Sequence, residues 1–186
     1  MIMRKKIFRI VFWAFVIVTT LPLVLIFFTP PLGDVSSTPE AAKSYDEKML
    51  QLNAGGNGAR EIRFTETELN SKVQESLGDM GGTSGAVALK SLTIHLTGNR
   101  LEGVFRVDAV GVSLYLLIGG TLSVANHRLV FNPTEMALGR LPVPIALVGP
   151  ALRDRLNSPD MQSLLALPDN VRSACVENGG LTIELE

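Results

Sequence analysis

Residues 64–69, Phe-Thr-Glu-Thr-Glu-Leu, carry the clearest signal for the start of a helix in this chain. Thr65 and Glu68 stand three residues apart, as in a capping box, and the flanking apolar residues match a hydrophobic staple. The apolar residues that follow recur at helical spacing, at Leu69, Val73 and Leu77. Gly78 is a typical helix terminator, so we predict a helix over residues 66–77.

After residue 87 the hydrophobic period changes from that of a helix to that of a strand. Apolar Leu92, Ile94 and Leu96 alternate with polar Thr93, His95 and Thr97. Turn residues at 98–99 and 126–127 separate extended stretches that reach residue 138, which predicts an antiparallel meander. Residues 171–185 predict a final hairpin around Asn178-Gly179-Gly180. The predicted fold class is therefore α+β, with a curved antiparallel sheet packed on one main helix.

Residues 110–120, VGVSLYLLIGG, interrupt the alternation because both faces of this strand are apolar. Such a strand must be covered on both sides. One interpretation is that it belongs to the core; the other is that part of it lines a groove for lipid or another hydrophobic ligand. In the second case the predicted lipid contacts are Leu114, Leu116, Ile118, Val143 and Ile145.

Residues 10–28, IVFWAFVIVTTLPLVLIFF, contain no charged residue. As a helix they would measure roughly 28 Å, close to the hydrocarbon thickness of a bilayer. Four basic residues precede this stretch and the next one is Lys43, which predicts a cytoplasmic N-terminus and an extracytoplasmic domain. We therefore expect a single-pass anchor in a bacterial inner (plasma) membrane. The alternative is a cleaved signal peptide, although residues 29–33 make a poor cleavage site.

These signals divide the chain into four parts: a basic cytoplasmic segment (1–9), a transmembrane helix (10–28), a spacer with a juxtamembrane helix (29–59) and an extracytoplasmic α+β domain (60–186). The juxtamembrane helix is expected over residues 39–52. A helical face begins at Ile145, and Pro150 predicts a kink or two short helices there. Another short helix is expected between Ser158 and Pro168.

Charge and cysteine content exclude some classes of function. The basic residues number 17 and the acidic residues 18, but residues 29–186 alone carry a net charge of −5. Such a domain is a poor match for nucleic acid or for an anionic lipid surface. The single cysteine, Cys175, allows no internal disulfide. No usable Asn-x-Ser/Thr acceptor is present, which favours a bacterial envelope protein.

No residue pattern indicates catalysis. The only histidines, His95 and His127, are expected at the surface, and Ser84 misses the Gly-x-Ser-x-Gly pattern because residue 86 is alanine. Metal ligands do not cluster in the sequence. We expect no enzyme activity, no cofactor and no metal.

Three motifs resemble a known family: FTETELN at 64–70, ALGRLPVP at 137–144 and NGGL at 178–181. Together with the order of elements they resemble the YpmS-like family of membrane-anchored envelope proteins of unknown function. More distantly, residues 60–186 are similar to small bacterial proteins related to tubular lipid-binding domains. The resemblance implies a curved sheet wrapped on a long helix and is compatible with an apolar groove. It supplies no catalytic residues.

The function expected from the sequence is non-enzymatic binding of lipid or another hydrophobic ligand by a membrane-anchored extracytoplasmic protein. The alternative is a scaffold or interaction subunit of an envelope complex. The expected partners are the membrane, through residues 10–28, and either a lipid or an envelope protein.

Overall fold

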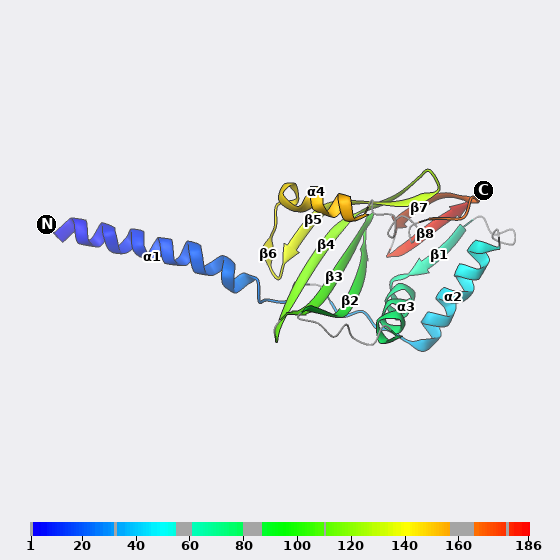
Figure 1. The fold of residues 1–186 in the computed structure, drawn as a ribbon, viewed down its shortest axis with the longest axis horizontal. Coiled ribbons are helices and arrows are strands. Elements are labelled where there is room, and N and C mark those ends of the chain that lie inside the picture. The colour runs from blue at the N-terminus through cyan, green and yellow to red at the C-terminus, as the bar shows by residue number, and fades with distance from the viewer. Residues whose placement is uncertain are drawn as a thin grey trace.

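The computed structural model describes residues 2–31, 33–54, 61–79, 87–109, 111–156, 166–177 and 179–186. The helices are α1 (Ile2–Leu25), α2 (Pro39–Asn53), α3 (Glu66–Asp79) and α4 (Ile145–Leu156). The strands are β1 (Glu61–Thr65), β2 (Val87–Thr97), β3 (Arg100–Ala109), β4 (Val112–Ala125), β5 (Arg128–Leu138), β6 (Leu141–Pro142), β7 (Val171–Glu177) and β8 (Gly180–Leu185). Helix α1 projects away from a domain that holds the other elements (Figure 1).

The strands form two antiparallel sheets. Strands β2 to β6 pair in chain order, and β8 lies between β1 and β7 in a three-stranded sheet. The predicted α+β class, the meander and the final hairpin are confirmed. The expectation of one sheet is wrong, because the final hairpin pairs with β1 and not with the meander. Residues 61–65 form this partner strand. Ile62 and Phe64 are buried while their neighbours are exposed, which is the alternation of a strand with one face in the core.

The structure contains the predicted helix starts together with their capping hydrogen bonds. The Glu68 N–H donates to Thr65 Oγ1 at 3.2 Å, and the Thr65 N–H donates to Glu68 Oε2 at 2.8 Å. This reciprocal pair is the capping box expected at the start of α3. Helix α2 begins in the same way, with the Ala41 N–H donating to Thr38 Oγ1 at 3.2 Å.

The predicted transmembrane helix over residues 10–28 is wrong. In the part of the chain that the structure describes, no helix combines the length and the apolar character needed to cross a membrane. Helix α1 ends at Leu25, and residues 26 and 27 lie in a turn. Its uncharged part, from Ile10 to Leu25, is therefore about 24 Å long, against roughly 30 Å of hydrocarbon in a bilayer.

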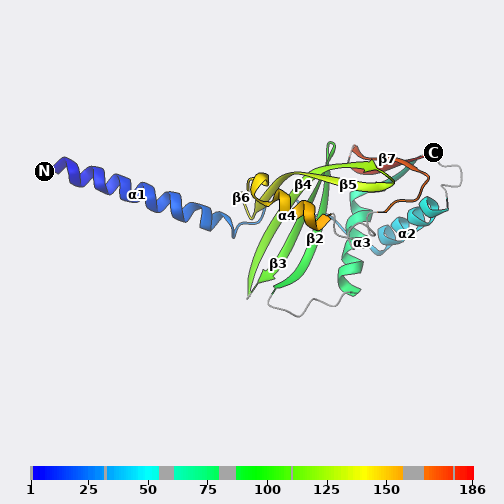
Figure 2. The same cartoon turned by 45° about the horizontal axis from the view of Figure 1, so that its top comes forward.

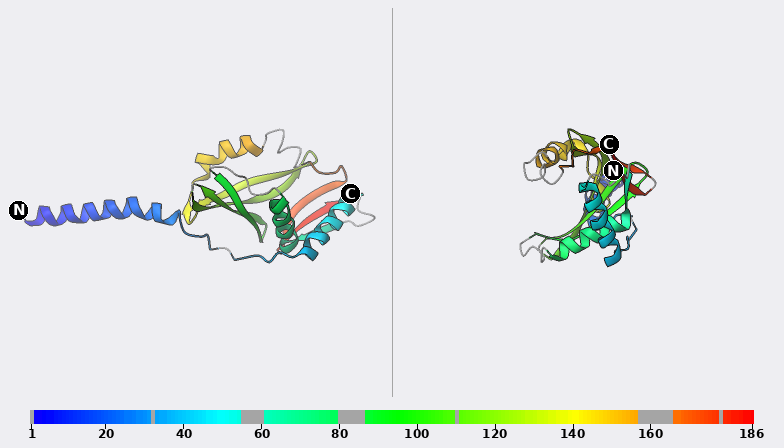
Figure 3. Two further views of the ribbon diagram at one scale, coloured as in Figure 1. Left: turned by 60° about the horizontal axis from the view of Figure 1, so that its bottom comes forward. Right: turned by 90° about the vertical axis from the view of Figure 1, so that its right-hand side faces the viewer.

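The end of α1 is attached to the turn between β5 and β6. The Arg140 N–H donates to Leu25 O at 2.8 Å, and Arg140 Nε donates to Thr29 O at 2.9 Å. The chain then runs toward α3, where the Thr38 N–H donates to Ser71 Oγ at 2.9 Å. Residues 29–31 and 33–38, the strap, are thus fixed at both ends, and Thr29, Pro30, Gly33 and Asp34 lie beside the five-stranded sheet (Figures 2 and 3).

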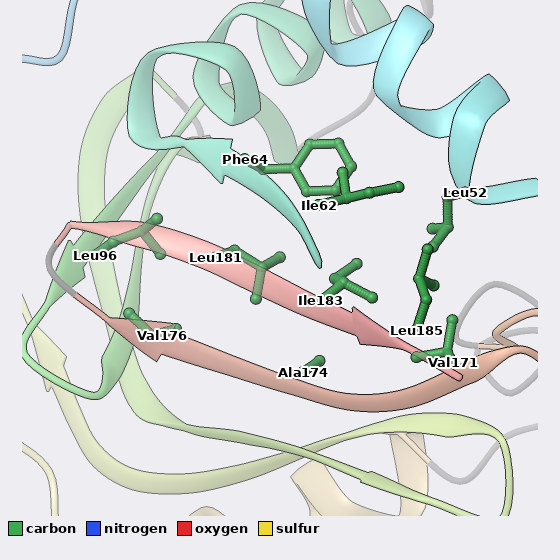
Figure 4. Packing of buried hydrophobic residues seen from close by; sticks show 10 residues of the cluster. All are labelled: Leu52, Ile62, Phe64, Leu96, Val171, Ala174, Val176, Leu181, Ile183 and Leu185. Atoms are coloured by element: carbon green, nitrogen blue, oxygen red, sulfur yellow. The ribbon is translucent and has the colours of Figure 1, made fainter. Parts of the chain in front are cut away.

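The main core lies at the end of the domain away from α1, where the two sheets meet α2 (Figures 1 and 4). Phe64, Leu52 and Val176 are its largest fully buried side chains. Its other buried members are Ile62, Leu96, Val171, Ala174, Leu181, Ile183 and Leu185. Leu122 and Val124 of β4 pack against this cluster. It therefore joins the small sheet to the far end of the large one.

Helix α4 follows β6 and packs on β5. It continues as one helix through Pro150, which excludes the alternative of two short helices, and the kink at Pro150 stays a prediction. The helix expected from Ser158 falls mostly on residues 157–165, outside the described residues. Seen along the long axis, the ribbon is an arc open on one side, with α4 at one tip and α3 at the other (Figure 3).

Candidate functional site

One face of the five-stranded sheet is apolar from edge to edge. The antiparallel register places Leu92, Phe105, Leu116 and Leu138 in a single row across four strands. The neighbouring rows continue the same surface, which we call the apolar trough: Leu89, Leu92, Ile94, Phe105, Val107, Leu114, Leu116, Ile118, Met136 and Leu138. All ten side chains are half-buried. The trough is thus partly covered by the protein, and the rest of its area is open.

The trough continues the core along β4. Leu122 and Val124 lie on the same face of the strand as Leu116, and both pack against the core cluster. Residues 114–118 lie on the other side of Gly119 and Gly120 and are not members of that cluster. The core therefore covers this apolar face at Leu122 and Val124, whereas the side chains of the face at residues 114–118 are less buried.

Helix α3 forms one wall of the trough, and an open cavity of about 420 Å³ lies between this helix and β2. The lining residues are Tyr45, Leu69, Lys72, Val73, Ser76, Leu77, Leu89, Leu92 and Ile94. Six of the nine are aliphatic, and the helical stripe that defined α3 in the sequence supplies three of them. The volume falls within the range of about 300–1,000 Å³ that is usual for ligand pockets.

The one lysine that lines this cavity already has two anionic partners. Lys72 Nζ lies 2.9 Å from Asp46 Oδ1 and 2.9 Å from Glu75 Oε2. Its hydrogen bonds to Glu75 and Asp46 raise the pKa of Lys72, so the ammonium stays charged. Burial raises the pKa of Tyr45, which therefore lines the cavity as a neutral phenol.

Gly103 forms part of the floor of the trough, between Ile94 on β2 and Ile118 on β4. A Cβ atom at this position would lie 3.2 Å from Phe105 Cε2 and 3.7 Å from Leu92 Cδ1. Its surroundings are side chains and not backbone, so a larger residue here would extend into the trough.

The structure brings three of the five predicted lipid contacts together. Leu114, Leu116 and Ile118 alternate along β4 and share the trough face. Val143 lies beside that surface, because its N–H donates to Met136 O at 2.9 Å and Met136 pairs with Ile118. Ile145 opens α4 and is half-buried. Whether these residues touch lipid stays a prediction.

Sequence reasoning missed the part of the trough that β2, β3 and α3 supply. The sequence predicts Leu92 and Ile94 on one face of a strand, and Leu69, Val73 and Leu77 on one face of a helix. Their meeting around a cavity depends on strand register and on how far α3 stands from the sheet. Neither property is encoded in a local pattern.

The opposite face of the sheet carries polar residues together with Val104 and Leu117, and a second, smaller cavity of about 180 Å³ lies there beneath the strap. Its lining includes His95, Arg106, Tyr115, Ser91 and Thr93. The expected surface position of His95 is wrong, because this residue is only 8% exposed. The reason is that α3 begins beside β2 and places Glu66 Oε1 3.3 Å from His95 Nδ1.

His95 and Glu66 are arranged like the base and the carboxylate of a catalytic triad, but no described residue takes the place of the nucleophile. Among the described residues, no hydroxyl or thiol hydrogen-bonds to the imidazole. Cys175 lies on β7, where burial and the nearby Glu177 raise the pKa of its thiol and keep it protonated. His127, as expected, lies in an exposed turn, with φ of 55°.

Comparison of the chain with models of known protein families and with curated proteins finds no match. The resemblance to the YpmS-like family therefore stays a prediction. The fold and the candidate site together define an antiparallel α+β protein with an apolar trough beside a helix.

Proposed function

We propose that this protein is a non-catalytic binding protein that holds the hydrocarbon part of a lipid in the apolar trough. The observation that carries the proposal is the open apolar pocket between α3 and β2, which shares Leu89, Leu92 and Ile94 with the ten half-buried apolar side chains of the trough. The expected location at a bacterial plasma membrane stays a prediction.

The physical basis is the free energy of covering apolar surface. Each Å² of apolar area removed from water contributes about 25 cal/mol, so a ligand that covers several of these side chains gains several kcal/mol. Among the residues that the structure describes, Lys72 is the one charged side chain that lines the cavity, and it already has Asp46 and Glu75 as partners. A hydrocarbon chain therefore matches this lining better than a charged small molecule.

Uptake of a fluorescent fatty-acyl probe by the full-length protein tests the proposal. Gly103→Leu would fill the floor of the trough and should reduce binding at least tenfold. Thr93→Leu is a matched control, since it adds bulk on the neighbouring strand but toward the opposite face of the sheet. Thermal unfolding of both variants shows whether each is folded.

The control also separates the trough from the exposed apolar surface of α1, which both variants retain. If the wild type binds the probe and Gly103→Leu binds it equally well, the trough is not the site. If neither the probe nor copurifying lipid is found on the wild type by native mass spectrometry, the proposed function is wrong.

The alternative function, an interaction subunit, is favoured by a separate observation. The apolar face of α2 packs on the core through Tyr45 and Met49 and is not free. Helix α1, in contrast, exposes aromatic residues, including Trp13, which is 61% exposed. A photocrosslinker at position 13 should label a partner protein under this alternative. Labelled partner with no lipid uptake would favour the interaction subunit over the lipid-binding protein.

A further inference from the structure

We propose that the cavity beneath the strap binds a small zwitterion with a carboxylate and an ammonium group, as in a free α-amino acid. This cavity lies on the face of the five-stranded sheet opposite the trough, so the site is separate from the lipid site of the proposed function. The proposal rests on polar and charged groups that line the cavity without a partner in the described part of the protein.

His95 supplies a hydrogen-bonding atom to the cavity. The residue is only 8% exposed, and its Nδ1 lies 3.3 Å from Glu66 Oε1. Because a carboxylate accepts the Nδ1–H, the Nε2 atom of the neutral ring is an acceptor. Among the described residues, no group hydrogen-bonds to Nε2, and this atom is not sealed inside the core. A buried imidazole with an open acceptor is a match for a donor on a bound molecule.

Three hydroxyl groups line the same cavity from the sheet. Ser91 and Thr93 belong to β2, and Tyr115 belongs to β4. The register places Ser91 and Tyr115 on either side of Arg106 in one row across three strands. None of the three hydroxyls hydrogen-bonds to another residue that the structure describes. Each can therefore donate to a bound molecule or accept from it.

The cavity also has one group of each charge. Arg106 lines it from the sheet, and Asp34 lines it from the strap. The guanidinium donates to Ser113 Oγ at 3.3 Å, but neither Arg106 nor Asp34 forms an ion pair with another described residue. The carboxylate of a ligand matches the planar donors of the guanidinium, and its ammonium matches Asp34. A simple anion would be repelled by Asp34 and a simple cation by Arg106, which favours a ligand that carries both charges.

The strap is attached at both ends in the absence of a ligand. Arg140 Nε donates to Thr29 O at one end, and the Thr38 N–H donates to Ser71 Oγ at the other. These contacts restrict the segment that carries Asp34. The entropy lost when a ligand bridges the strap and the sheet is therefore reduced.

Saturation-transfer difference NMR of the full-length protein with glycine, L-alanine, L-serine, propionate and ethylamine tests the proposal. Propionate and ethylamine are alanine without its ammonium and without its carboxylate, so each presents a single charge. We expect at least one of the amino acids to bind, at least about fivefold more tightly than propionate or ethylamine. Asp34→Asn should weaken amino-acid binding and strengthen propionate binding, because it removes the negative charge alone.

Arg106→Gln should weaken amino-acid binding at least about fivefold. Arg106 is exposed, so the variant is expected to fold. Arg100→Gln is the matched control, since it removes a positive charge from the same strand and the same face but outside the cavity lining. This control should bind the amino acids as the wild type does.

The two ligand sites should fail independently. Thr93→Leu should fill the cavity and abolish amino-acid binding while the fluorescent acyl probe still binds, and Gly103→Leu should have the opposite effect. If no amino acid binds the wild type, or if Arg106→Gln binds it fully, the proposed site is wrong. Propionate that binds as tightly as L-alanine would overturn the selection for a zwitterion. Amino-acid binding without any lipid uptake would overturn the proposed function and support this site.

Discussion

The side chain of Asn70 hydrogen-bonds both backbone polar groups of Ile94. Its Nδ2 donates to Ile94 O at 2.7 Å, and the Ile94 N–H donates to its Oδ1 at 2.7 Å. One helical turn earlier, Glu66 Oε2 accepts the Leu96 N–H at 2.9 Å. Two side chains of α3 therefore act as the missing neighbour of β2, which is the edge strand of the large sheet. This link fixes the wall of the trough against its floor.

Replacing Asn70 with alanine should lower the free energy of unfolding by about 2–4 kcal/mol. Asn70 is only 2% exposed, so the change leaves two buried backbone groups of Ile94 without partners. Urea denaturation followed by circular dichroism measures the effect. Gln74→Ala, at an exposed position on the same helix, should change stability by less than about 0.5 kcal/mol. Equal stability of the two variants would contradict the proposed edge pairing.

The carboxylate of Glu68 should make the protein sensitive to acid in a defined pH range. Burial alone would raise the pKa of Glu68, but hydrogen bonds from Lys48, Ser44 and the Thr65 N–H outweigh it and lower the pKa to about 2. The ordinary value is 4.5, so the folded state holds this proton less tightly than the unfolded state. The resulting stabilisation is fully present above pH 4.5 and is lost as the pH falls toward 2.

The predicted loss across this range is about 2–3 kcal/mol of unfolding free energy. Glu68→Gln should flatten the stability profile between pH 4.5 and 2 and should be less stable than the wild type at pH 7. Glu47→Gln, at an exposed position on α2, should keep the acid-dependent loss. A Glu68→Gln profile parallel to that of the wild type would show that another group causes the acid sensitivity.

Local signals in the sequence were sufficient to predict most helices and strands, because the interactions that start and end these elements join residues close together in the chain. The capping box at Thr65 and Glu68 fixed the start of α3, and the turn residues at 126–127 adopt positive φ between β4 and β5. The end of α1 could not be predicted in this way. Residues 26–28 are as apolar as those before them, and the helix ends where Leu25 O meets Arg140, a contact between distant residues.

The candidate site was predictable only in part for the same reason. Alternation placed Leu114, Leu116 and Ile118 on one face, but alternation is equally consistent with a core. What separates trough from core is the position of the second sheet, which covers Leu122 and Val124 and not Leu116. That position depends on the pairing of β1 with β8, between residues more than a hundred positions apart. The burial of His95 likewise depends on where α3 crosses β2.

Two glycines of the large sheet should respond differently to alanine. A Cβ at Gly120 would collide with the backbone oxygen of Asn132 and would lie 2.8 Å from the Phe131 ring, at a point where the register between β4 and β5 shifts. Gly120→Ala should therefore lower the unfolding free energy by about 1–3 kcal/mol. The Cβ added by Gly103→Ala would meet only side chains, so this change should alter the unfolding free energy by less than about 1 kcal/mol. The comparison needs only thermal melts, and a reversed order would contradict it.

The attachment of α1 to the domain should depend on Gly139 and Arg140. Gly139 has φ of 60°, and a Cβ there would meet the backbone oxygens of Leu25 and Ile26. Gly139→Ala should therefore displace the end of α1 from the β5–β6 turn. Arg140→Ala should remove two interactions: the side-chain hydrogen bond to Thr29 O, and the contact of the guanidinium with the Phe28 ring, whose centre lies 5.6 Å away. Limited proteolysis between residues 25 and 31 measures the result, with cleavage expected at least fivefold faster in both variants. Arg128→Ala, at the far end of the strand that leads into this turn, is the control and should leave this rate unchanged. Unchanged cleavage in Gly139→Ala would show that the contact with the β5–β6 turn does not hold α1 in place.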